Sequence, residues 1–315
     1  MPANRPPALF LGATIAILAP ASAPRDLARI DAGKAVLAER YGLRFIDYPI
    51  APVGYLSHTD AARAQAFNAA VANPDVDALF CVRGGYGTLR ILDAIEYEAA
   101  QAHPKLLVGY SDITALQLAL YRNAGWTSVS GPMVAVEWPA PDEPSAAQFW
   151  QLATGHGTGP LVGPYGETLE PVRSGSAEGV LLGGNLSLVA KLIGTPYLPE
   201  LTGAILFLEE VGEEPYRLDG LFAHLKLSGL FDALGGLVLG QFTGDTKPST
   251  TPGLTTQDVI AHYTADLGIP VARNLAYGHV AIKNAIPVGV RARLDVTTSV
   301  AELTLLGSPV RAAPV

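Results

Sequence analysis

Ser111 is the residue of this chain whose type and position most directly suggest covalent chemistry. It lies in Gly109-Tyr-Ser-Asp112, where an apolar run ends and a helical pattern begins. A side chain at such a corner of an open α/β sheet points into the crevice above the strands, where ligands bind and a nucleophile is accessible. The same serine would also be an ordinary helix N-cap that bonds the N–H of Thr114. The two interpretations are compatible, because a helix start leaves N–H groups free to hold an oxyanion.

A nucleophilic serine needs a general base and a group that orients it. Of the six histidines, His279 follows a turn-like run and is placed to reach a cleft. None of the histidines is spaced as H-E-x-x-H, so a metal site of that type is excluded. The apolar run 204–208 ends in Glu209 and Glu210. A carboxylate there could hold a histidine N–H, or both glutamates could begin a solvated acidic loop.

The loop Arg83-Gly-Gly-Tyr-Gly87 directly follows the apolar run 78–82. Glycines at the end of a parallel strand allow backbone N–H groups to turn toward a ligand, and Gly84 or Gly85 could hold an oxyanion. The loop matches neither the phosphate-loop pattern nor G-x-G-x-x-G, so nucleotide binding there is not favoured. A short glycine cluster of this kind could also make only a turn.

Composition excludes several classes of protein. The 315 residues carry a formal net charge of −8 without a basic cluster, so we expect no nucleic-acid partner. No apolar run approaches the ~20 residues of a membrane span, so we expect no membrane partner. The single cysteine, Cys81, excludes an intrachain disulfide framework and a cysteine-rich metal site, and it fits a reducing compartment. We expect neither a metal nor a cofactor.

These candidate residues require elements that bring them together. Apolar runs alternate with helical patterns over residues 14–123, which predicts a parallel sheet covered on both faces. The run 9–20 could pass for the core of a signal peptide, but it has one basic residue in front and is broken at Gly12. It therefore reads better as a first strand at Thr14–Ala19.

The alternation stops where prolines and glycines accumulate. Residues 137–175 are expected to be a linker with a short helix around Trp150. The alternating segments 286–294 and 300–306 predict antiparallel strands, and the polar stretch 243–256 predicts a surface loop. We therefore predict a first domain at residues 1–136, the linker, and a second domain at 176–315.

Six motifs together, in this order along the chain, resemble the LD-carboxypeptidases of the murein tetrapeptide family, which includes the microcin C self-immunity peptidases. The resemblance implies an α/β fold of two domains with the site in the groove between them. The first would be Rossmann-like with a parallel sheet, and the second mixed α/β and rich in antiparallel strands. The motifs are Ile15-Ala-Ile-Leu-Ala-Pro20, Arg83-Gly-Gly-Tyr-Gly87, Gly109-Tyr-Ser-Asp-Ile-Thr114, Gly183-Gly-Asn-Leu-Ser187, Phe207-Leu-Glu-Glu-Val-Gly-Glu213 and Gly278-His279.

The resemblance also implies a role for each residue. Ser111 would be the nucleophile, His279 the general base, and Glu209 rather than Glu210 the carboxylate that orients it. The backbone N–H groups of Gly85 and Asp112 would form the oxyanion hole. The implied catalytic residues are thus Ser111, Glu209 and His279, in that chain order.

One departure from the family pattern concerns the loop around the base. The family often has G-H-G with an asparagine soon after, whereas this chain has Val280 after the histidine and Asn284 further on. We expect the difference to alter the shape of the pocket around His279.

The implied function is that of a serine carboxypeptidase, a hydrolase and serine protease. It would remove the terminal D-alanine of murein tetrapeptide across an L–D peptide bond through an acyl-enzyme, in the cytoplasm, during peptidoglycan recycling. The family uses no cofactor and is usually a homodimer. Arg83, beside the oxyanion loop, is a candidate for binding the carboxylate of the peptide substrate.

Two other functions remain open from the sequence. An immunity-type peptidase would cleave an acyl-nucleotide antibiotic, and Trp138 or Trp150 could then stack on the base of that peptide–nucleotide. A non-catalytic protein that binds a small ligand in a Rossmann-like groove would not need Glu209 and His279 to meet Ser111.

Overall fold

The first sheet is built on apolar strands that are buried along their length. In the residues that the computed structural model describes, 3–244 and 253–311, its strand order is β12-β5-β4-β3-β1-β2. Strands β1 to β5 are parallel, and β12 is antiparallel to β5. The bounds are β1 Thr14–Leu18, β2 Arg44–Asp47, β3 Ala78–Cys81, β4 Leu106–Val108, β5 Ser128–Ser130 and β12 Ile286–Val288.

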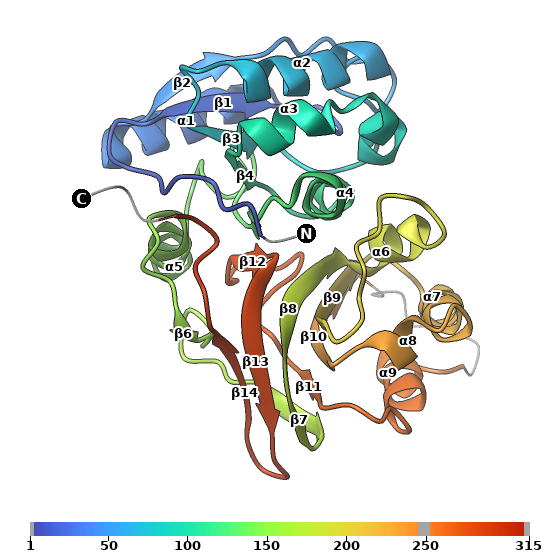
Figure 1. Cartoon of the computed structure of the whole chain (residues 1–315). Coiled ribbons are helices and arrows are strands. Elements are labelled where there is room, and N and C mark those ends of the chain that lie inside the picture. Colours follow the sequence, from blue (N-terminus) through green and yellow to red (C-terminus); the bar gives the residue numbers. More distant parts are fainter. Residues whose placement is uncertain (1–2, 245–252, 312–315) are drawn as a thin grey trace.

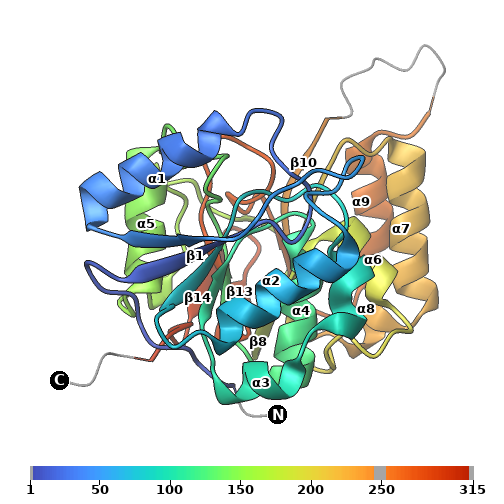
Figure 2. The same ribbon diagram turned by 90° about the horizontal axis from the view of Figure 1, so that it is seen from above.

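Helices cover both faces of this sheet, as its buried strands require. Figure 2 shows α1 and α2 on opposite sides of the sheet. Because β1 lies between β2 and β3, the strand order reverses there, and the crevice at such a switch point is where doubly wound sheets bind ligands. The helical bounds are α1 Ala28–Tyr41, α2 Asp60–Ala72, the 3₁₀ helix η1 Thr88–Ala94, α3 Tyr97–Ala102 and α4 Ile113–Ala124.

The second sheet has the order β6-β14-β13-β8-β9-β10-β11-β7 among the described residues. Its middle strands β8 to β11 are parallel, whereas β13 runs antiparallel to both of its neighbours, β8 and β14. Figure 1 shows α6 to α9 gathered beside the parallel strands. The bounds are α5 Glu143–Ala153, β6 Gly159–Pro160, β7 Glu170–Arg173, β8 Gly175–Asn185, α6 Leu186–Leu192, β9 Ile205–Val211, α7 Pro215–Leu227, α8 Leu230–Ala233, β10 Gly236–Thr243, α9 Thr256–Thr264, β11 Val271–Arg273, β13 Val290–Val296 and β14 Ala301–Leu305.

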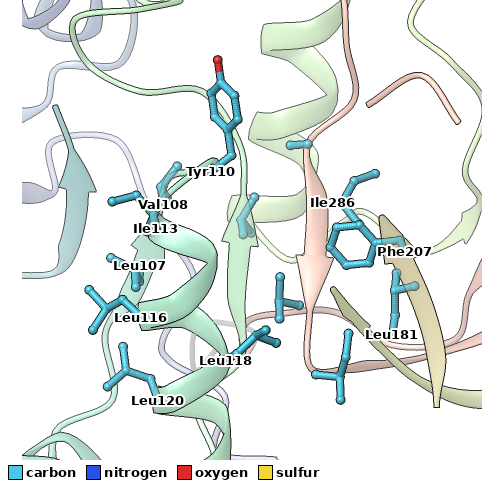
Figure 3. Packing of buried hydrophobic residues seen from close by; sticks show 14 of the residues in the cluster. Leu107, Val108, Tyr110, Ile113, Leu116, Leu118, Leu120, Leu181, Phe207 and Ile286 are labelled. Atoms are coloured by element: carbon cyan, nitrogen blue, oxygen red, sulfur yellow. The ribbon is translucent and has the colours of Figure 1, made fainter. Parts of the chain in front are cut away.

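Helix α4 lies between the two sheets and joins their cores. Its residues from Ile113 to Leu120 are all buried, although an ordinary surface helix buries one face. Figure 3 shows α4 with Leu116 on one side and Leu118 turned toward Leu181 and Phe207 of the second sheet. The buried apolar side chains of both sheets belong to one continuous cluster. Packing against α4 therefore sets the position of the two sheets relative to each other.

The architecture confirms the predicted fold class, a parallel first sheet followed by a mixed unit with antiparallel strands. The strand expected near residue 14 is confirmed as β1, and the helix around Trp150 as α5. The division at residues 136 and 176 stays a prediction. Residues 245–252 of the expected loop 243–256 lie outside the described residues. Within the described ranges, no helix combines the length and the apolar character needed to cross a bilayer.

Candidate active site

Ser111 lies in the tight turn between β4 and α4. Its φ is 65°, one of two positive values among the described non-glycine residues, and such left-handed backbone is strained for a side chain other than glycine. The prediction that its hydroxyl caps the helix is wrong. Asp112 is the N-cap residue, and the Thr114 N–H donates to the backbone carbonyl of Ser111 at 3.0 Å. The hydroxyl is therefore free for another partner.

The glycine loop after β3 makes room for this turn. A Cβ added to Gly84 would lie 2.7 Å from the Cβ of Ser111, so only glycine fits at that close approach. Gly85 has a φ of 115°, and a Cβ there would lie 2.5 Å from Oγ of Ser22. Ser22 follows β1, and its Oγ accepts the Tyr86 N–H at 3.1 Å. The loops after β1, β3 and β4 thus meet at the switch point of the first sheet.

His279 reaches Ser111 from the segment that follows β11. Its Nε2 lies 2.9 Å from Ser111 Oγ, and its Nδ1 lies 2.8 Å from Oε2 of Glu209. The His279 side chain is 21% exposed, whereas that of Glu209 is fully buried. The imidazole therefore bridges a buried carboxylate and a hydroxyl that lines a cavity. The structure brings together the serine, histidine and glutamate that the sequence singled out.

Glu209 is placed by the pairing of β8 with β9. In that register Asn185 lies opposite Glu209. The Asn185 Nδ2 donates to Glu209 Oε1 at 3.3 Å, while its Oδ1 accepts the Leu188 N–H at the start of α6. A buried carboxylate is costly unless it is hydrogen-bonded, and Asn185 and His279 satisfy one oxygen each.

Glu210 points to the opposite side of the same strand, as alternation along a strand requires. Its carboxylate accepts the Asn185 Nδ2 at 2.8 Å, the Ser187 N–H at 2.8 Å and the Val211 N–H at 2.9 Å. It is 4% exposed, and its hydrogen bonds go to Asn185, Ser187 and Val211 rather than to His279. Glu209, not its neighbour, is the carboxylate beside the histidine.

Asp112 ties the glycine loop to the start of α4. Its carboxylate accepts the Thr88 N–H and the Thr88 hydroxyl, both at 2.8 Å, and that hydroxyl lies 2.6 Å from the Asp112 carbonyl. Burial raises the pKa of the Asp112 carboxyl, while the bonds from Thr88 oppose the shift. The clamp fixes the two loops relative to each other.

The N–H groups of Gly85 and Asp112 remain available at this junction. Among the described residues neither donates to a protein acceptor. Preorganised backbone donors beside a nucleophile can stabilise the negative charge that develops on an attacked carbonyl oxygen. The same part of the chain holds no group of three His, Cys, Asp or Glu side chains suited to a metal ion.

A cavity of about 380 Å³ opens beside Ser111 and His279. Arg25, Arg29 and Arg83 line it. Arg29 donates to the backbone carbonyls of Ala135 and Val136. The guanidinium groups of Arg25 and Arg83 have no hydrogen-bond or ion-pair partner within the described ranges. Two uncommitted guanidinium groups next to the serine are suited to an anion, although Asp26, which accepts the Ala28 N–H, lines the same cavity.

A second cavity, of about 510 Å³, also borders His279 and is lined by Tyr110, Glu137, Asp142, Val280 and Lys283, among others. Val280, which stands where the family often has a glycine, therefore forms part of the wall of this cavity. Trp138 also lines this cavity, but its side chain is fully buried. Trp150 stacks on Tyr41 with ring centroids 3.9 Å apart and lines neither cavity. Burial of Trp138 and the distance of Trp150 from both cavities argue against the predicted stacking of a base on either ring.

Sequence reasoning missed four residues of the site: Ser22, Thr88, Asn185 and Lys283. Asn185 lies in one of the six motifs, yet its role depends on the pairing of β8 with β9. Ser22 and Thr88 follow predicted strands, and polar residues just after parallel strands could have indicated that they line the site. Lys283 carried no signal in the sequence.

The chain is similar to LD-carboxypeptidases over most of its length. The sequence model of the LD-carboxypeptidase N-terminal domain matches residues 15–131, and that of the C-terminal domain matches residues 178–294. A Streptomyces coelicolor protein assigned as a carboxypeptidase is 37% identical, over 93% of this chain and 94% of its own. The murein tetrapeptide carboxypeptidase of Pseudomonas aeruginosa is 31% identical, over 89% and 92%. The Escherichia coli microcin C7 self-immunity protein is 28% identical, over 76% and 77%.

Solved structures agree with this similarity. The muramoyltetrapeptide carboxypeptidase from Oxalobacter formigenes superposes with a TM-score of 0.81 at 29% identity, covering 93% of this chain and 98% of the other. The fold and the sequence place this protein among the peptide hydrolases that act at a carboxyl terminus. The chain belongs to the LD-carboxypeptidase family.

Proposed function

We propose that this protein is a serine LD-carboxypeptidase that hydrolyses the bond between an L-residue and the terminal D-alanine of murein tetrapeptide. The observation that carries the proposal is the continuous hydrogen-bond chain from Ser111 Oγ through His279 to the buried carboxylate of Glu209. A serine whose hydroxyl meets a histidine, itself oriented by a carboxylate, is the arrangement that acyl transfer requires. The relative from Pseudomonas aeruginosa is named for that peptide.

The first half of the reaction forms an acyl-enzyme. Ser111 Oγ attacks the scissile carbonyl carbon while His279 Nε2 takes the hydroxyl proton. The resulting oxyanion would be held by the N–H groups of Gly85 and Asp112. His279 then gives its proton to the departing amine nitrogen, the carbon–nitrogen bond breaks, and D-alanine leaves.

The second half returns the free enzyme. Water attacks the ester carbon as His279 accepts a proton from it, and the oxyanion forms again at the same amides. The carbon–oxygen bond to Ser111 then breaks, and His279 returns the proton to Oγ. Glu209 accepts the Nδ1–H bond throughout, which keeps Nε2 facing the serine and stabilises the imidazolium.

We assign recognition of the substrate carboxylate to Arg83, assisted by Arg25. Both line the cavity beside Ser111, and both guanidinium groups are uncommitted in the described part of the chain. A guanidinium binds a carboxylate through two parallel hydrogen bonds, which suits an enzyme that selects a chain terminus. Replacing Arg83 by methionine should raise KM about 10-fold or more, which corresponds to roughly 1.4 kcal/mol. The same change should leave the KM for a peptide with a C-terminal amide unchanged, because that peptide has no carboxylate for Arg83 to bind.

The test is a comparison of Ser111→Ala with the wild type by mass spectrometry of the products. The wild type should release D-alanine from murein tetrapeptide, and the variant should lose about 10⁴-fold or more of that rate while keeping its melting temperature. A matched assay uses a peptide–nucleotide conjugate of the kind that an immunity peptidase would cleave. Cleavage of that conjugate alone would replace the proposed substrate. Undiminished cleavage by the variant would exclude the serine mechanism.

The proposal extends to a cytoplasmic homodimer that acts in peptidoglycan recycling. Its support is the family resemblance and the substrate named for the relatives, since recycled murein peptides are processed inside the cell in this family. Light scattering of the purified chain tests the dimer, and fractionation of cells that produce it tests the compartment. A monomer or an exported protein would correct these two parts and leave the chemistry standing.

A further inference from the structure

The ammonium group of Lys283 lies between the segment that carries the serine and the segment that carries the histidine. Its Nζ donates to the Tyr110 hydroxyl at 2.9 Å and to the Val280 carbonyl at 3.2 Å. Tyr110 directly precedes Ser111, and Val280 directly follows His279. One side chain therefore bonds the chain neighbour of each reacting residue.

Glu137 anchors this ammonium from a third segment. Its Oε1 lies 2.7 Å from Lys283 Nζ and accepts the Tyr110 hydroxyl at 2.9 Å. Its Oε2 accepts the Met133 N–H at 2.9 Å. The side chains of Lys283 and Glu137 are only 7% and 17% exposed. An ammonium has three hydrogens to donate, and here it has three acceptors, so its burial is compensated.

Tyr110 connects this cluster to the imidazole. The rings of Tyr110 and His279 meet edge to face, with centroids 5.2 Å apart. Burial and the adjacent Glu137 carboxylate raise the pKa of Tyr110, so its phenol stays protonated and donates to that carboxylate. Figure 3 shows the hydroxyl of Tyr110 pointing away from the packed aliphatic side chains below it. The ring is thus held at its hydroxyl end by the cluster and packs against the imidazole.

We propose that Lys283 is a positioning residue that holds Ser111 and His279 in hydrogen-bond reach by tying their two segments together at Tyr110 and Val280. The segments belong to different parts of the fold, the turn after β4 and the connection from β11 to β12. A displacement of about 1 Å between reacting groups can cost about 100-fold in rate. The catalytic importance of the Ser111–His279 contact rests on the proposed function. The effect of Lys283 on the geometry of that contact can be tested without substrate.

The principal test is Lys283→Met, which keeps the aliphatic length and removes the ammonium. We expect kcat to fall about 10- to 100-fold with KM changed less than 3-fold, because substrate contacts remain while the reacting groups shift. Lys105→Met is the matched control. Lys105 is also a buried lysine, 8% exposed, whose Nζ donates to the carbonyls of Asn73 and Val76 far from the site. It should lower the melting temperature and leave kcat unchanged.

Three further variants keep the test decisive. Lys283→Met combined with Glu137→Gln leaves no uncompensated carboxylate, so it should fold and show the same loss of kcat. Tyr110→Phe keeps the ring and cuts the bond to Lys283, and we expect a smaller loss, of about 3- to 10-fold. Lys283→Arg, which restores a cation at the site, should recover part of the lost kcat. Unchanged kcat in folded Lys283→Met, or an equal loss in Lys105→Met, would overturn the proposal.

A measurement without substrate separates this proposal from the proposed function. In the ¹⁵N–¹H spectrum of the histidine side chains, the His279 signals should shift between wild type and Lys283→Met and stay unchanged in Lys105→Met. That shift would support the positioning role even if the wild type released no D-alanine. Identical His279 signals in wild type and Lys283→Met would overturn it, whichever substrate the enzyme cleaves.

Discussion

The nucleophile side of the site, named for the role proposed for Ser111, and the base side, named for the role proposed for His279, are held in place in different ways. On the nucleophile side, Ser111 owes its position to a left-handed backbone and to the close approach of Gly84. On the base side, His279 owes its position to a buried carboxylate that pairs with Asn185 across β8 and β9. The first side depends mainly on backbone conformation and close backbone packing, and the second depends on buried side-chain hydrogen bonds.

This difference predicts two kinds of sensitivity. On the nucleophile side, a substitution that adds volume should be harmful, because there is no space for a Cβ where Gly84 approaches Ser111. A substitution that changes only polarity should be tolerated better. Buried hydrogen bonds tolerate conservative changes of volume but not of charge, because an unpaired buried group costs about 1–3 kcal/mol. The following four predictions test that distinction, from the largest expected effect to the smallest.

Changing Glu209 to glutamine tests the base side and should have the largest effect. The amide keeps the volume of the carboxylate but removes its charge and can present its NH₂ group to His279, which favours the wrong tautomer. We expect kcat to fall about 10³- to 10⁴-fold. Glu210→Gln is the matched control on the same strand, and steady-state kinetics should show a far smaller loss. Equal losses in both variants would remove the distinction between the two carboxylates.

Changing Gly84 to alanine tests the nucleophile side. The new Cβ would lie 2.7 Å from that of Ser111, so the turn must shift, and we expect kcat to fall about 100-fold. Gly268→Ala is the matched control, because a Cβ there meets nothing within 4 Å. Kinetic parameters and melting temperatures of both variants check the prediction. A Gly84→Ala enzyme with normal kcat would show that the close approach has no bearing on the reaction.

Changing Thr88 to valine tests the clamp between the glycine loop and the start of α4, which carry the proposed oxyanion donors. The variant keeps the side-chain shape and the backbone N–H bond but loses both hydroxyl bonds to Asp112. We expect kcat to fall about 10-fold and the free energy of unfolding to fall by about 1–2 kcal/mol, the worth of one or two hydrogen bonds. Chemical denaturation and kinetics measure both quantities. Lower stability with unchanged kcat would limit the clamp to a structural role.

Changing Asp112 to asparagine should have the smallest effect, on the pH dependence of stability. Burial raises the folded-state pKa of Asp112, so its contribution to stability is full below the unfolded-state pKa and is lost as pH rises through the folded-state pKa. Asparagine keeps an acceptor for Thr88 and does not titrate. As pH rises above about 4, the ordinary pKa of an aspartate, the melting temperature of the wild type should therefore fall relative to that of the variant. Parallel curves would contradict the raised pKa.

The sequence predicted those parts of the site that follow from patterns of neighbouring residues. The corner at Ser111 follows from an apolar run that meets a helical pattern, and the resemblance to a family selected Glu209 over Glu210. The left-handed turn at Ser111 could not be predicted, because no local pattern requires φ of 65° there. The hydroxyl was therefore assigned to a cap that the backbone does not form.

The fold divides in the same way. Strands β1 to β4 and their helices follow from hydrophobic periodicity, which acts over a few residues. Strand β12 could not be assigned to the first sheet, because its partner β5 lies more than 150 residues earlier and only tertiary packing selects it. Lys283 was missed for the same reason, since its three acceptors come from separate segments.

The late position of β12 has a consequence for the synthesis of the protein. The first sheet receives its last strand from residues 286–288, directly after the segment that carries His279. While the chain emerges from the ribosome, the edge of β5 stays open until residues 286–288 have been made. Ser111 can therefore meet His279 only after the segment 279–288 has been synthesised, well over 150 residues after the serine itself.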